Sequence, residues 1–362
     1  METLKFIQEH GLHALTDGLG ITIREHPDGL INLDYSQIDS PKLHPVVLEC
    51  RGLILVKDTL EVACRPMGRF FNYTEPGCTA VLDESADFYP KVDGSLIKIY
   101  HFNGKWYIAT RGTVFADNTT HMSDVTFADL VYRALRVDNH IHFSALADNY
   151  LNKNISYNFE VTSVENRVVT RYEGYTLTYL NSRVTKTGEY IDQSDIVQKF
   201  GAKIQTPLKF NTPEEAVLYV DQLVDLQEGL VVYNNGMPSG KLKNSLYVHV
   251  HHSRGDGPIT IKRIKNLIYD QDHEEYLGYF PEDTPLFQPY IDAYNNLFVR
   301  FAESWNDVKD IQDQKEFAIA VKDLPYKGML FSKRQNTEQS VTSMLSKLTI
   351  NSRHGLLDAL KS

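Results

Sequence analysis

The chain has 362 residues, 42% of them hydrophobic and 23% charged, which is typical of a globular protein long enough for two domains. The net charge of −10 argues against a protein that coats nucleic acid indiscriminately, although a basic groove can exist within an acidic whole. Three cysteines without a CxxC pair disfavour a disulfide scaffold or a cysteine zinc site. No apolar run reaches about 18 residues and the opening residues lack the order of a signal peptide, so we expect a cytoplasmic protein without a membrane partner.

Residues up to about 250 combine short strand-like runs with a few amphipathic helices. Helices are predicted for the opening segment, for SDVTFADLVYRALRV and for SDIVQKFG, which Gly201 ends. Runs rich in β-branched and aromatic residues predict strands at LECRGLILV, FYPKVDGSLIKIYHF, KWYIATRGT, ISYNFEVTSV, YTLTYLNSRV and EGLVVYN. Asn103-Gly104 predicts a hairpin turn between two of them. This mixture favours an α+β domain of antiparallel sheets with flanking helices over a repeated βαβ unit.

Beyond residue 258 the pattern becomes helical. In QPYIDAYNNLFVRFAESWNDV the apolar residues recur at the spacing of one helix face. The connector HVHHSRGDGP separates this part from the strands. We therefore predict an α+β domain at 1–252 and an all-helical domain at 253–362.

Three other patterns were weighed as possible sites. HVHH places His249 and His251 on one face of an expected strand, but no third ligand follows at a typical spacing, so no metal site is predicted. TKTGEY lacks the GxxxxGK[ST] frame, which excludes a P-loop. The last 32 residues carry an excess of positive charge that could contact RNA phosphates or form a solvated helix face, through Lys333, Arg334, Lys347, Arg353 and Lys361.

Lys91 opens the string KVDGS, where the chain enters a predicted strand. A lysine amine with its ordinary pKa of about 10.4 is almost wholly protonated at pH 7 and is a poor nucleophile. Burial or nearby cations lower that pKa and free the lone pair. Gly94 lets the backbone turn sharply beside the amine and can let a ligand approach closely. Taken alone, this pattern more often marks a solvated lysine at a surface turn.

Six further charged residues lie within or beside otherwise apolar strands: the acids Glu160 and Glu228 and the bases Arg51, Arg111, Lys241 and Lys243. Lys241 and Lys243 are two positions apart and therefore share a strand face. A charge that enters a β-core is costly unless it is paired or bound to a ligand. One or two such residues could be structural ion pairs, whereas six indicate a pocket for phosphate and a metal ion.

In chain order, ECRG, KVDGS, TRG, NFEVTSVENRVV, EGLVVY and KLK resemble the motifs of the covalent nucleotidyltransferases, which include ATP-dependent ligases and mRNA capping enzymes. The longer strings LECRGLIL, RPMGRFFNYTE, TGEYI and EGLVVY…GKLKNSLYV are similar to the T4 RNA ligase 1-like family. The resemblance covers about residues 30 to 250, and the shared order and spacing make it specific. Over the last third of the chain it rests on helical character and length.

The resemblance implies that Lys91 attacks the α-phosphate of ATP and forms a lysyl–AMP. AMP then passes to the 5′-phosphate of an RNA end, and a 3′-hydroxyl displaces it to seal the strand. Lys241 and Lys243 would contact the α-phosphate, and their charge would lower the pKa of Lys91. Glu160 would contact the ribose and Glu228 would help to hold hydrated magnesium, so both carboxylates are candidate metal ligands.

The resemblance also implies cations around the nucleotide. Arg51 would touch it, and Arg69 and Arg111 stand where the family has lysines, which share their charge but differ in geometry. Arg111 is counted among the catalytic candidates. Phe71, in the RFFN string, could pack near the nucleotide or belong to the core.

Two positions of the family pattern are ambiguous in this chain. A tyrosine upstream of ECRG helps to form the nucleotide pocket in the family, and either Leu33 or Tyr35 could occupy that position. A metal-linked aspartate of the helical domain could correspond to Asp272, but Asp270 lies beside it, and a solvated acidic face is the alternative.

These implications define an ATP-dependent RNA ligase that uses magnesium, with manganese as an alternative ion. Residues 1–252 would form the adenylyltransferase domain and residues 253–362 an RNA-specificity domain. The expected partner is RNA with 5′-phosphate and 3′-hydroxyl ends, and analogy suggests cleaved tRNA, a monomer, and a bacteriophage source that acts in the host cytoplasm.

Two other functions are weighed against this one. A DNA ligase or capping enzyme usually has a β-barrel after its first domain, and the helical pattern here disfavours both. A catalytically silent RNA-binding module is disfavoured by the intact KVDG string together with Lys241 and Lys243.

Overall fold

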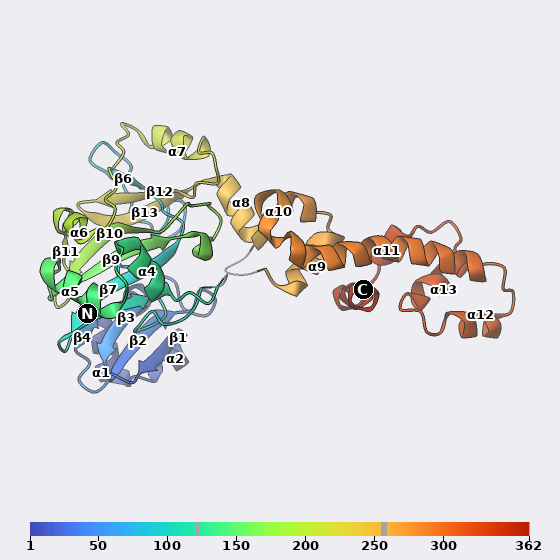
Figure 1. Cartoon of the computed structure of the whole chain (residues 1–362), viewed down its shortest axis with the longest axis horizontal. Helices are drawn as coiled ribbons and strands as arrows, with labels where there is room; N and C mark the ends of the chain where they lie inside the picture. The colour runs from blue at the N-terminus through green and yellow to red at the C-terminus, as the bar shows by residue number, and fades with distance from the viewer. Residues whose placement is uncertain (121–122, 255–258, 362) are drawn as a thin grey trace. The chain divides into compact units, whose positions relative to one another are not determined.

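The structure is a computed structural model that describes residues 1–120, 123–254 and 259–361. It divides into two compact units, Met1–His252 and Ser253–Ser362 (Figure 1). Residues 255–258 of the predicted connector lie outside the described residues.

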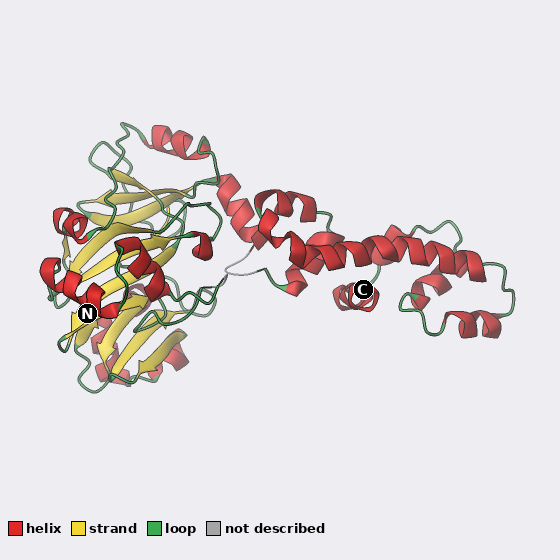
Figure 2. Ribbon diagram, viewed as in Figure 1, coloured by secondary structure: helices red, strands yellow, loops and turns green. Residues whose placement is uncertain are grey.

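Three small sheets form the body of the first unit (Figure 2). The first, in the order β1-β2-β3-β4, contains β1 (Ile21–His26), β2 (Leu30–Tyr35), β3 (Arg51–Val56) and β4 (Val62–Cys64). The second, in the order β11-β10-β9-β7-β8, contains β7 (Ser95–Phe102), β8 (Lys105–Thr110), β9 (Ile155–Thr162), β10 (Thr176–Val184) and β11 (Tyr190–Ile191). The third, in the order β5-β13-β12-β6, contains β5 (Phe71–Asn72), β6 (Asp87–Pro90), β12 (Gly229–Asn234) and β13 (Met237–Lys243).

Neighbouring strands in the described sheets run antiparallel, apart from the short parallel pair of β5 and β13. Helices surround the sheets: α1 (Glu2–His10), α2 (Ala14–Leu19), α3 (Pro45–Glu49), α4 (Phe127–Leu135), α5 (His140–Tyr150), α6 (Ser194–Phe200), α7 (Pro213–Asp221) and α8 (Ser245–Arg254). The predicted α+β fold class is confirmed.

Local sequence signals explain several of these elements. Asn103 and Gly104 have φ angles of 47° and 77°, so both central residues of the β7–β8 turn are left-handed, as a two-residue hairpin with a matching twist requires. Thr126 and Asp129 form a capping box that begins α4. Gly201 ends α6 with a φ of 108°.

The largest core of this unit lies between the second sheet and the helices α4 to α6. Phe143 of α5, Phe159 of β9 and Phe200 of α6 are buried in it. A second core packs β1 to β3 against α1 to α3. A third core, which includes Phe88 of β6 and Leu230 of β12, packs the third sheet against α7. Together these cores hold the strands that carry the polar residues described below.

Lys98 is a fully buried cation where the first two sheets meet. It belongs to β7, yet its Nζ donates hydrogen bonds to the Gly52 carbonyl of β3 at 2.6 Å and to Asn32 Oδ1 of β2 at 3.2 Å. Burial lowers the pKa of this amine to about 8. The side chain therefore joins the sheet that carries Arg51 to the sheet that carries Glu160.

The described part of the second unit is made of helices: α9 (Ile261–Tyr269), α10 (His273–Tyr279), α11 (Thr284–Val308), α12 (Gln314–Val321), α13 (Lys327–Gln335), α14 (Val341–Ser346) and α15 (Ile350–Leu360). The long α11 packs against α9 and α15, and Phe287, Leu297 and Phe301 are buried. The predicted helical character is confirmed. None of the described helices has both the length and the apolar character that a membrane span needs.

Candidate active site

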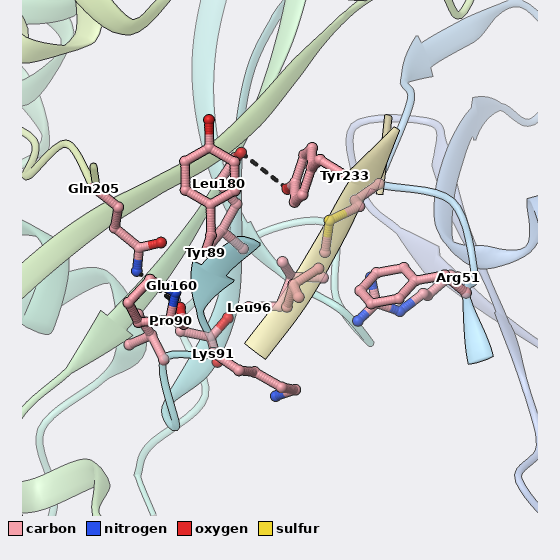
Figure 3. A pocket seen from close by; sticks show the side chains of 13 residues that line it. Arg51, Tyr89, Pro90, Lys91, Leu96, Glu160, Leu180, Gln205 and Tyr233 are labelled. Carbon is pink, nitrogen blue, oxygen red and sulfur yellow. Dashed lines mark hydrogen bonds between the residues drawn. The ribbon is translucent and has the colours of Figure 1, made fainter. Parts of the chain in front are cut away.

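A cavity of about 220 Å³ lies in the first unit around Lys91 (Figure 3). Its charged lining residues are Lys91, Glu160 and Arg51, and its apolar walls include Phe70, Leu180 and Val231. These residues come from all three sheets and their connections, so the cavity exists only in the folded unit.

The KVDG segment is a rigid bridge from β6 to β7. The backbone N–H of Lys91 donates to the Gly229 carbonyl at 2.8 Å. The carboxylate of Asp93 accepts two backbone hydrogen bonds, at 2.8 and 2.7 Å, and one from the Tyr247 hydroxyl at 2.6 Å. A Cβ at Gly94 would lie 2.3 Å from the Val161 carbonyl oxygen, so the glycine is required by its close approach to β9.

Glu228 is held between two lysines. Its carboxylate accepts from Lys91 Nζ at 2.5 Å and from Lys243 Nζ at 2.8 Å. The Glu228 side chain is only 4% exposed, against 23% for Lys91 and 27% for Lys243. The nucleophile candidate is thus anchored by a nearly buried carboxylate at the edge of the cavity.

The predicted lowering of the Lys91 pKa is wrong. Burial alone lowers this pKa, but the negative charges of Glu228 and Glu160 outweigh burial, so the pKa lies above its usual value. The pKa of Glu228 lies below its usual value because Lys91 and Lys243 outweigh the effect of burial. Lys91 is therefore held protonated until its carboxylate contact is weakened.

Glu160 faces the same cavity and accepts a hydrogen bond from the Gly94 N–H at 3.1 Å. Burial raises the pKa of its carboxyl group to about 7, and repulsion from Glu228 acts in the same direction. The group can thus change its charge near neutral pH, as residues at active sites often do.

This pKa predicts a stability cost that the variant Glu160→Gln removes. A carboxyl pKa raised from 4.5 to about 7 gives stability that is fully present below pH 4.5 and is lost as the pH rises through 7. At pH 8 we expect the variant to be more stable by about 3 kcal/mol, and at pH 4.5 to match the wild type. Thermal unfolding at both pH values measures this, and equal midpoints at pH 8 would contradict it.

Lys241 and Lys243 project from β13 toward the neighbourhood of Lys91. Lys241 Nζ lies 5.3 Å from the ring centre of Phe70, which lines the cavity. Burial, and then the charges of Lys91 and Lys243, lower the pKa of Lys241 to about 8. Three amines are therefore close enough to repel one another, which favours binding of an anion between them.

Tyr35 lies beneath two arginines. The guanidinium carbons of Arg69 and Arg111 are 4.1 and 4.3 Å from its ring centre. Arg111 is fixed further by an ion pair with Asp34 at 2.8 Å. Of the two residues predicted for the family tyrosine position, Leu33 and Tyr35 are both buried in the same core, and Tyr35 also makes these cationic contacts. Neither of them lines the cavity.

Arg51 lines the cavity and has an unsatisfied donor. Its Nη1 is buried and finds no hydrogen-bond partner among the described residues, which suits a ligand oxygen. The ring beside Arg51 is Phe70, at 5.8 Å from the guanidinium carbon. Phe71, the ring that was considered as a neighbour of the nucleotide, is buried and does not line this cavity. Its ring centre lies 5.2 Å from the guanidinium carbon of Arg69.

Asp272 belongs to the helical unit, where it is the N-cap residue of α10. It therefore lies outside the group of residues that the first unit brings together. No group of three or more potential metal ligands is found among the residues that the structure describes.

The strand predicted at HVHH is wrong, whereas RNA contact by the basic residues near the end of the chain stays a prediction. The HVHH string lies in α8, not in a strand, so His249 and His251 do not share a face. The helix begins because Asn244 Oδ1 accepts from the Tyr247 N–H at 3.0 Å. In the last 32 residues the charged groups of Lys333, Arg334, Arg353 and Lys361 donate to oxygens of their own unit, which favours a structural role for them.

Sequence reasoning missed several residues around the site. Tyr89 and Tyr233 line the cavity, and their rings meet edge to face at 5.0 Å. Gln205 donates from Nε2 to the Pro90 carbonyl at 3.1 Å, next to Lys91. Tyr89 could have been found because it lies two positions before Lys91 on β6, whereas Gln205 has no local signal.

A lysine paired with a nearly buried carboxylate, beside further cations and an arginine with an unbonded donor, is an arrangement of the kind that nucleophilic chemistry on a phosphate ester requires. The sequence profile of the RNA ligase family matches residues 49–248, and the chain belongs to this family, that of the T4 RNA ligase 1 type.

Individual proteins show the same likeness. A protein of Autographa californica nuclear polyhedrosis virus described as a bifunctional polynucleotide kinase/RNA ligase is 36% identical over an alignment of 362 positions, which covers 95% of this chain and 51% of the viral protein. The chain therefore spans about half the length of that relative. Among solved structures, Naegleria gruberi RNA ligase with PPi has a TM-score of 0.37 and 17% identity over 48% of this chain and 53% of its own. A mutant of that ligase with ATP and Mn has a TM-score of 0.36 and 16% identity over 47% and 52%.

Proposed function

We propose that this chain is an ATP-dependent RNA ligase that works through a lysyl–AMP at Lys91. The observation that carries the proposal is the contact of Lys91 Nζ with Glu228 at the edge of a cavity that Glu160 and Arg51 also line. The cavity takes ATP with its α-phosphate toward the amine and its base between the apolar walls.

In the first step the neutral amine of Lys91 attacks the α-phosphorus of ATP. The new N–P bond forms as the bond to the β-phosphate oxygen breaks, and pyrophosphate leaves with its electron pair. Because Glu228 holds Lys91 protonated, the ammonium must first pass a proton to water, and this deprotonation becomes easier as the Glu228 contact weakens. Lys241, Lys243 and Arg51 neutralise the charge on the phosphate oxygens.

In the second step a 5′-phosphate oxygen of RNA attacks the phosphorus of lysyl–AMP, and the amine of Lys91 leaves. In the third step an RNA 3′-hydroxyl attacks that 5′-phosphorus, loses its proton and expels AMP. The substrates are therefore RNA ends with a 5′-phosphate and a 3′-hydroxyl, of which cleaved tRNA is one candidate. The protein would act as a monomer in the host cytoplasm.

Magnesium or manganese suits the carboxylates Glu228 and Glu160 when it arrives with the nucleotide. The bound ion would supply a positive charge to the phosphates. A Glu228 carboxylate that turned toward this ion would release its hold on Lys91. Asp272 of the helical unit remains a candidate for a further metal contact, and residues 253–362 for the selection of RNA.

The test is incubation of the full chain with magnesium and ATP labelled at the α-phosphate. We expect label that survives a denaturing gel, a mass increase of one AMP on the peptide that contains Lys91, and release of pyrophosphate. A chain that takes no label from ATP is not this enzyme. Comparison of single-stranded RNA with nicked duplex DNA, and of ATP with GTP, separates an RNA ligase from a DNA ligase or capping enzyme.

A further inference from the structure

A second cavity, of about 410 Å³, adjoins the first in the same unit. Tyr89, Leu180, Gln205 and Tyr233 line both cavities, whereas Lys91 lines only the first. The hydroxyl of Tyr89 points away from Lys91 (Figure 3). The second cavity therefore continues from the end of the first that is remote from the nucleophile.

Aromatic rings dominate the walls of the second cavity. Tyr179 of β10 and Tyr190 of β11 join Tyr89 and Tyr233 around it. The Tyr233 hydroxyl donates to the Leu180 carbonyl at 3.1 Å and Tyr190 accepts from a backbone N–H at 2.9 Å, so these rings are held in place. Fixed tyrosine rings offer flat faces on which planar groups stack.

The charge of this cavity is opposite to that of the first. Its charged lining residues are Asp87 and Asp192, and its lining includes no lysine or arginine from the described part of the chain. Asp87 Oδ1 forms an ion pair with Lys209 Nζ at 3.0 Å, which partly neutralises its charge. A phosphate here would face two carboxylates, so the cavity selects an uncharged planar group.

The second cavity also offers hydrogen-bonding positions to an uncharged planar ligand. Asp192 accepts from Ser194 through both of its oxygens, yet a carboxylate has about four acceptor positions. Burial, and then the charges of Asp87 and Asp192, raise the pKa of Tyr89, which keeps its hydroxyl protonated and able to donate. Acceptors and a donor beside these tyrosine rings match the amino and ring-nitrogen edges of a nucleobase.

We propose that the second cavity binds a nucleobase of the RNA substrate beside the adenosine in the first cavity. Its volume lies within the range of small-ligand sites, and its continuity with the first cavity brings the two ligands together. This inference rests on the proposed function, because it assigns the base to the RNA that is sealed. A second ATP molecule is the rival occupant.

A matched pair of variants tests the proposal in the full chain. Ser194 lines only the second cavity, and the indole of Ser194→Trp would fill it. Asp195 is the next residue of α6, is exposed and lines neither cavity, so Asp195→Trp makes the same change outside it. We measure the Kd for single-stranded RNA, the KM for 5′-adenylylated RNA sealed without ATP, and the rate of lysyl–AMP formation from ATP alone.

We expect Ser194→Trp to raise the Kd and the KM for RNA about tenfold, and Asp195→Trp to match the wild type. Lysyl–AMP formation shows whether the first cavity is intact. If Ser194→Trp slows that step as much as it weakens RNA binding, the second cavity belongs to the ATP site and the proposal fails. Unchanged RNA affinity also overturns it.

RNA strands with a single abasic nucleotide identify the bound base. At one position the wild type should lose about tenfold in affinity and Ser194→Trp should lose almost nothing, because the variant has already lost that contact. Equal losses in both proteins at every position overturn the proposal. If wild-type protein never forms lysyl–AMP, the proposed function fails, while the RNA affinities still decide whether this cavity holds a base.

Discussion

Lys91→Arg is expected to abolish lysyl–AMP formation, with a loss of at least about 10⁴-fold. The guanidinium keeps a positive charge beside Glu228, so the ion pair and the fold are preserved. Arginine does not lose its proton in proteins and therefore cannot supply the lone pair that attacks phosphorus. Incubation with labelled ATP, followed by a denaturing gel, measures the loss.

The control for this variant is Lys199→Arg, the same change at an exposed lysine of α6. We expect that control to take up label at the wild-type rate. Lys91→Arg should still seal RNA that already carries a 5′-adenylate, because the lysine is not the nucleophile in that step. Label on Lys91→Arg would move the nucleophile to another residue.

Glu228→Gln is expected to slow lysyl–AMP formation by about 10² to 10³-fold at its best pH, because the site loses a carboxylate proposed to hold the magnesium ion that neutralises the phosphates. It should also shift the pH dependence. In the wild type the rate rises with pH as the ammonium of Lys91 loses its proton, and Glu228 raises the pKa of that group. Without the carboxylate the pKa falls, so the variant should reach its plateau at a lower pH.

Adenylylation rates measured between pH 6 and 10 test this shift, with the exposed Glu173→Gln as the matched control. The variant should also unfold more easily, because Lys91 and Lys243 lose the partner between them. We expect the free energy of unfolding to fall by about 2 kcal/mol, which is less than for a fully buried ion pair, since both lysines are partly exposed. The wild-type rate should still be rising at pH 10, because the pKa of Lys91 lies above its usual value. A variant whose rate also rises without a plateau up to pH 10 would show that Glu228 does not control the proton of Lys91.

Local patterns were the part of the fold that the sequence could predict. The turn at Asn103-Gly104 and the end of α6 at Gly201 depend on left-handed backbone angles that few residues adopt, and both are found. HVHH was misassigned because a short apolar and polar alternation fits a strand as well as a helix end. The hydrogen bond from the Tyr247 N–H to the Asn244 side chain begins a helix here. It depends on the orientation of that side chain, which the sequence does not show.

The candidate site shows the same division. The motifs predicted that Lys91, Glu160 and Glu228 belong to one site, and the structure places Lys91 beside both carboxylates. Each motif could be recognised because its residues are continuous in the chain. The direction of the Lys91 pKa was missed, because it depends on whether carboxylates or cations lie nearest to one atom. Phe70 and Phe71 are adjacent, and only the path of the chain into β5 determines which ring reaches the cavity.

Lys98 has a consequence for how this unit opens. A strand of the second sheet cannot separate from β2 and β3 without leaving an ammonium group and two acceptors buried and unbonded. Partial opening of one sheet is therefore unfavourable, and the two sheets should unfold as one cooperative block. The candidate site would then lose its arginine and carboxylate contacts together or keep both, with no populated form in which only one of the two contacts remains.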